Sequence, residues 1–205
     1  MGKLARRYKR SASFNTGEQT MQTYFLKKKE LQQLIGTLTN KGFQCIGPQV
    51  RDANILYAPL NDIKQLPWGV ADTQQPGDYQ LTKGDPSYAF SWTNGLSSIK
   101  TFLFKAQETV WRVQRDENGR LQFNPVVDVE PIALLGIRPC DIAAMLIQDK
   151  VFLEGKYIDQ RYQARRKALF TIVMNCGRSS QNCFCIAAGY SPKADKGFDL
   201  AMTEL

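Results

Sequence analysis

The chain has 205 residues, a length that suits one domain or a domain with a small subdomain. Hydrophobic residues make up 43% of it and charged residues 22%, which excludes disorder as the description of the whole chain. The net charge is +8, but half of that excess lies in residues 1–20, which hold Lys3, Arg6, Arg7, Lys9 and Arg10 against Glu18. We therefore predict a basic, disordered tail over 1–22, a single domain over 23–205, and no nucleic-acid partner.

The compartment follows from what the sequence lacks. It has no run of about 18 apolar residues, so no membrane span is predicted. Its first 30 residues lack the apolar core of a secretory signal, so the cytoplasm is the expected location. Thiols are usually kept reduced there, and five cysteines is an odd number, so metal ligation or redox chemistry is a better account of them than disulfides.

The first half of the domain opens with an amphipathic helix. Apolar residues recur at helical spacing between 27 and 41, and Gly42 follows where a helix commonly stops. Short strands are predicted over 43–46 and 55–58, and a further strand over 101–104. The stretch 67–86, rich in proline and glycine, is predicted to be an irregular surface loop anchored by its aromatic side chains.

An antiparallel hairpin is predicted next. The segments 110–113 and 121–123 read as strands, and they flank the sequence Asp116-Glu117-Asn118-Gly119. Asn-Gly between two apolar runs is a strong hairpin signal.

The last third forms a strand-helix-helix-strand unit. An apolar strand over 133–137 leads into Pro139, which suits the first position of a helix, and a second, more polar helix is predicted over 159–167. A buried strand over 169–174 follows. A crossover of this length implies that the two strands run parallel. The predicted fold is α/β (α+β mixed), with a partly parallel sheet and an antiparallel hairpin.

Four of the five cysteines follow these strands. Cys140 lies just past the first and Cys176 just past the second, and the next loop returns Cys183 and Cys185. Because ligands in open α/β sheets gather beyond the carboxyl ends of the strands, we expect these four thiols to meet there. Cys45 lies within an apolar strand and is expected to be a packing residue.

A metal at this site would be held by sulfur alone, since the chain has no histidine. Sulfur donors favour an iron-sulfur cluster first and zinc second. The expected cofactor is a [4Fe-4S] cluster, with structural zinc as the alternative. The spacing is not that of a ferredoxin, and only Cys183 and Cys185 are close enough for a typical zinc pair.

The surroundings of Cys140 add two expectations. Its place in the first turn of a helix predicts a lowered thiol pKa. Arg138 is expected either to offset the charge of a thiolate-bound cluster or to form a salt bridge at the sheet edge. Hydrolytic or acid-base catalysis finds little support, because there is no histidine, no Gly-x-Ser-x-Gly and no Walker loop, so no catalytic residue is predicted.

Several phrases together carry a family resemblance. They are Phe25-Leu26-Lys27-Lys28, Ile46-Gly47-Pro48-Gln49-Val50-Arg51-Asp52, Leu135-Gly136-Ile137-Arg138-Pro139-Cys140-Asp141, Val151-Phe152-Leu153, Asn175-Cys176 and Cys183-Phe184-Cys185. In this order they resemble the amino-terminal domain of the iron-sulfur electron-transfer subunits of anaerobic sulfite reductase and of sulfhydrogenase, where it is the beta subunit.

The resemblance implies an electron-transfer subunit without turnover of its own. Such subunits relay electrons between a flavin-containing NAD(P)H reductase subunit and a catalytic subunit, and they carry [4Fe-4S] clusters in a carboxyl-terminal ferredoxin domain. That domain is lacking here, so the sequence is expected to be a truncated copy or a fragment. The alternative function is a non-redox scaffold or binding module whose cysteines hold zinc or remain free.

Overall fold

A computed structural model describes residues 22–95, 97–127 and 129–205, so the tail predicted over 1–22 lies almost wholly outside the described residues. Its centre is a five-stranded sheet in the order β2-β1-β7-β8-β9. The strands are β1 (Gln44–Arg51), β2 (Asn54–Pro59), β7 (Ile132–Ile137), β8 (Leu169–Met174) and β9 (Leu200–Met202). The β1–β2 pair is antiparallel and the other three pairs are parallel. The predicted mixed α/β fold is confirmed.

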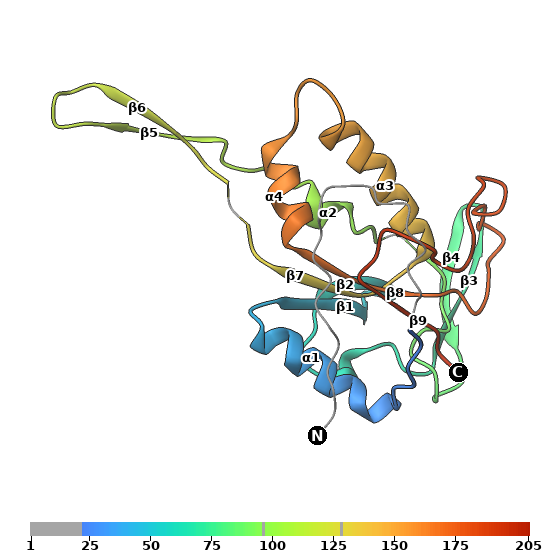
Figure 1. Cartoon of the computed structure of the whole chain (residues 1–205). Helices are drawn as coiled ribbons and strands as arrows, with labels where there is room; N and C mark the ends of the chain where they lie inside the picture. The colour runs from blue at the N-terminus through green and yellow to red at the C-terminus, as the bar shows by residue number, and fades with distance from the viewer. Residues whose placement is uncertain (1–21, 96, 128) are drawn as a thin grey trace.

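Helices cover both faces of this sheet (Figure 1). The helix α1 (Leu31–Asn40) lies on one face, preceded by the short helical turn η1 (Lys28–Glu30). The helices α3 (Pro139–Leu153) and α4 (Gln160–Ala168) lie on the other. Because β7 is buried between these layers, residues 133–137 are all buried, which explains their unbroken apolar run.

The turn from β7 into α3 depends on a glycine. Gly136 has φ +80°, and a Cβ added there would lie 2.5 Å from Cε1 of Phe90, so neither the backbone nor the space admits a side chain. The pairing of β7 with β8 shifts register between Leu135 and Ile137. This irregularity directs the chain toward Arg138 and Cys140 at the carboxyl edge of the sheet.

Two local predictions were wrong. The segment 101–104 is not a strand, because Lys100–Leu103 form the short helix α2, which buries Leu103. A four-residue apolar run does not distinguish a strand from a helical turn, and here the long-range packing decides.

The stretch 67–86 is not wholly irregular either. It contains a hairpin of β3 (Val70–Gln75) and β4 (Asp78–Lys83), preceded by the helical turn η2 (Ile63–Gln65). These strands are short and polar, and the one fully buried residue in β3 is Asp72. Apolar alternation, the usual strand signal, is therefore absent from them.

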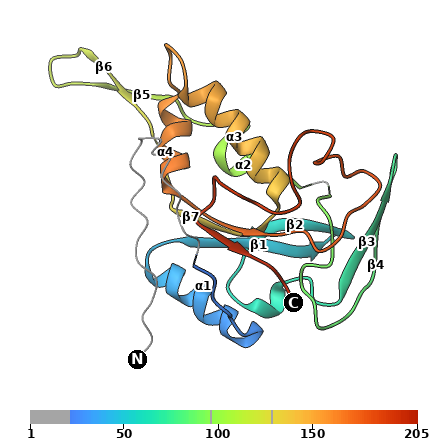
Figure 2. The same cartoon turned by 45° about the vertical axis from the view of Figure 1, so that its right-hand side comes forward.

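The second hairpin is where it was predicted. Its strands β5 (Trp111–Arg115) and β6 (Leu121–Pro125) pair antiparallel around a turn with Gly119 at φ +78°. In both Figure 1 and Figure 2 this ribbon extends away from the rest of the domain. Within the described residues, no helix combines the length and apolar character needed to cross a bilayer.

Candidate metal centre

The candidate site lies at the carboxyl ends of the adjacent parallel strands β7 and β8. Cys140 is the second residue of α3, and Cys176 follows the end of β8 by two residues. The backbone N–H of Cys176 donates to the carbonyl of Pro192 at 3.0 Å, which ties the strand end to the returning loop. That loop carries Cys183 and Cys185.

The four thiols influence one another electrostatically. Charge on Cys183 and on Cys185 raises the pKa of Cys176, and charge on Cys176 raises that of Cys140. All five cysteines are free. In the described part of the chain, however, no three His, Cys, Asp or Glu side chains form a group that could hold a metal ion. The thiols thus share one edge of the sheet without a preformed coordination shell.

The prediction of a lowered pKa for Cys140 was wrong. Part of this residue reaches solvent, but the surrounding protein desolvates the thiol and, together with the charges of Asp141 and Cys176, raises its pKa to about 12. The backbone N–H groups of Asp141 and Cys140 act in the predicted direction but are outweighed. The thiol is therefore neutral near pH 7, and a bound metal would have to displace its proton.

Arg138 is buried beneath these cysteines, with only 2% of its surface exposed. Its Nη2 donates to the carbonyls of Phe90 at 2.9 Å and Trp92 at 2.5 Å, and its guanidinium lies 4.4 Å from the centre of the Trp92 ring. Its positive charge lowers the pKa of Cys176, although burial raises that pKa by more.

The charge of Arg138 has no close counter-ion. Among the described residues it makes no ion pair within 4 Å, so the salt bridge considered as the alternative is not present, and its buried Nε has no hydrogen-bond partner. The neighbouring Asp141 accepts from the Arg138 backbone N–H at 3.0 Å, but burial raises the pKa of that carboxyl. A buried cation of this kind is costly unless an anion lies nearby.

Asn94 is a site residue that the sequence did not indicate. Its Nδ2 donates to Sγ of Cys140 at 3.2 Å and to Oδ2 of Asp141 at 2.8 Å. The adjacent Thr93 is held by the fully buried Asp72, whose carboxylate accepts from the Thr93 backbone N–H at 2.8 Å and hydroxyl at 2.7 Å. Asn94 lies 46 residues before Cys140 in a segment without motif or periodicity, so only the fold shows the contact.

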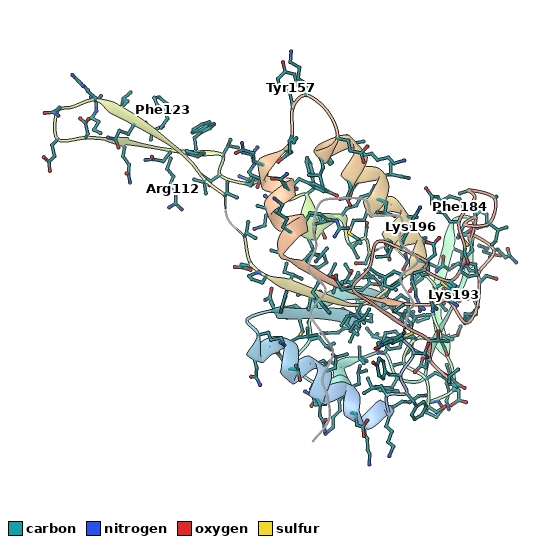
Figure 3. The ribbon with its side chains drawn as sticks, in the orientation of Figure 1. Arg112, Phe123, Tyr157, Phe184, Lys193 and Lys196 are labelled. Atoms are coloured by element: carbon teal, nitrogen blue, oxygen red, sulfur yellow. The ribbon has the colours of Figure 1, made fainter. Side chains whose placement is uncertain are left out.

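The loop that carries Cys183 and Cys185 is largely exposed. The backbone N–H of Ser180 lies 3.3 Å from Sγ of Cys183, within reach of a hydrogen bond to sulfur. Phe184, between the two cysteines, is 73% exposed and lies on the outer side of the molecule (Figure 3).

Cys45 is separate from this site. It is 5% exposed within the core, and its thiol lies 3.7 Å from the carbonyl of Ile35. The prediction that it is a packing residue is confirmed.

The residues at the sheet edge fit a thiolate-bound, anionic metal group in their chemistry. The donors are all sulfur, two of the sulfurs already accept hydrogen bonds from Asn94 and Ser180, and the unpartnered Nε of Arg138 marks an unbalanced positive charge. Hydrogen bonds to ligand sulfurs and nearby charge are the means by which proteins tune such groups.

Comparison with known proteins identifies a distant relative. The chain is 28% identical over 120 residues to sulfhydrogenase 2 subunit beta of Pyrococcus furiosus, a match that covers 57% of this chain and 33% of the relative. The chain thus matches about a third of the relative's length. No protein-family model matches it, and neither does any solved structure. The match confirms the resemblance to the sulfhydrogenase beta subunit.

Proposed function

We propose that this protein is an iron-sulfur electron-transfer subunit of a cytoplasmic oxidoreductase complex of the sulfite reductase or hydrogenase type. Cys140, Cys176, Cys183 and Cys185 would hold a [4Fe-4S] cluster at the carboxyl edge of the sheet. The observation that carries the proposal is the buried cation of Arg138, which lies beneath these thiols without a counter-ion. A thiolate-bound cluster would supply the missing negative charge.

The relative supports the same direction, since its name describes a subunit of a sulfhydrogenase. When bound, a [4Fe-4S] cluster accepts and donates one electron at a time. We further propose that the chain relays electrons between a flavin-containing NAD(P)H reductase subunit and a catalytic subunit. The reaction itself would then belong to the catalytic subunit, and no residue of this chain is assigned a catalytic role.

Binding would require two changes in the protein. The loop of Cys183 and Cys185 must close toward Cys140 and Cys176, because the described residues have no preformed metal group. The neutral thiols must also lose their protons, so metal affinity should fall as the pH is lowered. Arg138 favours both changes by stabilising negative charge at the thiols.

The proposal is tested by a potentiometric titration of protein prepared and loaded with iron and sulfide without oxygen. We expect a visible absorption band that bleaches reversibly with one electron per cluster. Zinc at about one per chain, with no reducible band, would instead support the non-redox scaffold.

Asn94 offers a finer test of the same site. The Asn94→Leu variant loses the N–H donor to Sγ of Cys140, a bond that would favour the reduced, more negative cluster. A hydrogen bond worth about 1 kcal/mol corresponds to about 40 mV for one electron, so the reduction potential should fall by about that amount.

The matched control for this titration is Asn124→Leu, which removes an exposed amide on the remote hairpin and should leave the potential unchanged. An unchanged potential in Asn94→Leu, with the cluster fully retained, would show that this side chain does not act on the cluster.

A further inference from the structure

The ribbon formed by β5 and β6 has one apolar and one polar face. Directly opposed residues of an antiparallel pair project to the same side. The register therefore places on one face the pairs Trp111–Pro125, Val113–Phe123 and Arg115–Leu121, and on the other face Arg112–Asn124 and Gln114–Gln122. Figure 3 shows Phe123 and Arg112 on opposite sides of the ribbon.

The apolar face lies in solvent. The exposed fractions are 54% for Trp111, 50% for Val113, 53% for Leu121 and 62% for Phe123. Scattered apolar residues on a surface need no explanation, but a contiguous patch marks an interaction site. Figures 1 and 2 both show the ribbon projecting away from the domain, and none of the described elements covers it.

The ribbon is well specified but poorly supported. Oδ1 of Asp116 accepts from the backbone N–H groups of Asn118 at 2.9 Å and Arg120 at 2.8 Å, which fixes the turn. A lone two-stranded hairpin is nevertheless marginal in water, and independent stability needs more strands or a packed apolar face. The sequence thus builds a strand pair whose apolar face calls for a second layer.

We propose that this second layer is the same ribbon of another copy of the chain. Two apolar faces packed against each other form a four-stranded sandwich with the Trp111 and Phe123 side chains inside and the Arg112 faces in water. An isologous interface of this kind is self-complementary by symmetry.

The position of Arg115 favours a second copy in antiparallel orientation. It is the one charged residue on the apolar face, and Val113–Phe123 is the middle of the three pairs on that face. A two-fold axis through this middle pair places Arg115 of each copy opposite Trp111 of the other. The guanidinium then meets an indole ring, a favourable contact, and not a second guanidinium.

The area available suits a weak dimer. Aromatic side chains bury about 150–250 Å² each, and with these exposed fractions the apolar face can lose on the order of 500 Å² per copy. The total of about 1,000 Å² reaches the lower bound expected of a specific interface. We therefore expect association in the micromolar range.

The test is sedimentation velocity of the full chain from about 1 to 100 μM. The wild-type chain should pass from monomer to dimer over this range, while the double variant Trp111→Ser, Phe123→Ser stays monomeric. Arg115→Ala should weaken association about tenfold, since two cation–π contacts are lost per dimer. The matched control, Arg112→Ser with Gln122→Ser on the opposite face, should dimerise like wild type.

Two results would overturn the proposal. A wild-type chain that stays monomeric at the highest concentration would mean that the apolar face receives another occupant. A dimer unaffected by the Trp111→Ser, Phe123→Ser variant would mean that association uses another surface. Melting temperatures equal to wild type would show that each variant is folded. Neither result bears on the cluster, which is measured separately.

Discussion

Alanine at Cys140, Cys176, Cys183 or Cys185 is expected to abolish the cluster, lowering iron from about four atoms per chain to near zero. Each substitution removes one thiolate and leaves an iron without its protein ligand. Iron and acid-labile sulfide are measured on each variant after purification without oxygen.

The matched control is Cys45→Ala, which removes a buried thiol that takes no part in the site. It should keep full iron while losing about 1–2 kcal/mol of stability through the small cavity it creates. Full iron in any one of the four site variants would remove that cysteine from the ligand set, and iron loss in all five would indicate general unfolding.

Replacement of Arg138 by leucine is expected to lower the free energy of unfolding by about 3–5 kcal/mol. The carbonyls of Phe90 and Trp92 lose their shared donor inside the protein, and the contact of the guanidinium with the Trp92 ring is lost as well. Arg138→Lys keeps the charge but not the fork of donors, so an intermediate loss is expected. Urea denaturation of metal-free protein measures these differences without a contribution from bound metal.

The same variants separate a structural role of Arg138 from an electrostatic one. If the cation balances the cluster, Arg138→Lys should hold clearly more iron than Arg138→Leu under conditions in which both are folded. Equal iron in the two would contradict that role. Arg120→Leu, at the exposed tip of the remote hairpin, serves as the control and should change stability by less than about 0.5 kcal/mol.

The sequence predicted the part of the fold that positions the cysteines. The apolar runs of β7 and β8, with Pro139 at the start of a helix, were enough to predict parallel strands whose ends carry Cys140 and Cys176. Asn118-Gly119 was enough to predict the β5–β6 hairpin. These signals are local and strong, and the packing agrees with them.

Other features depended on contacts that no local pattern records. The helix α2 replaced a predicted strand because the burial of Leu103 decided an ambiguous apolar run. The β3–β4 hairpin was not predicted because its buried member is Asp72. Burial reversed the predicted pKa shift of Cys140, and the approach of Asn94 to that thiol arises only from the folded chain.

The most direct test of the central claim is the iron, acid-labile sulfide and zinc content of wild-type protein purified without oxygen. We predict about four irons and four sulfides per chain and a broad visible absorption band. About one zinc per chain, or no metal at all in protein that never met oxygen, would contradict the assignment of an iron-sulfur cluster to the four cysteines.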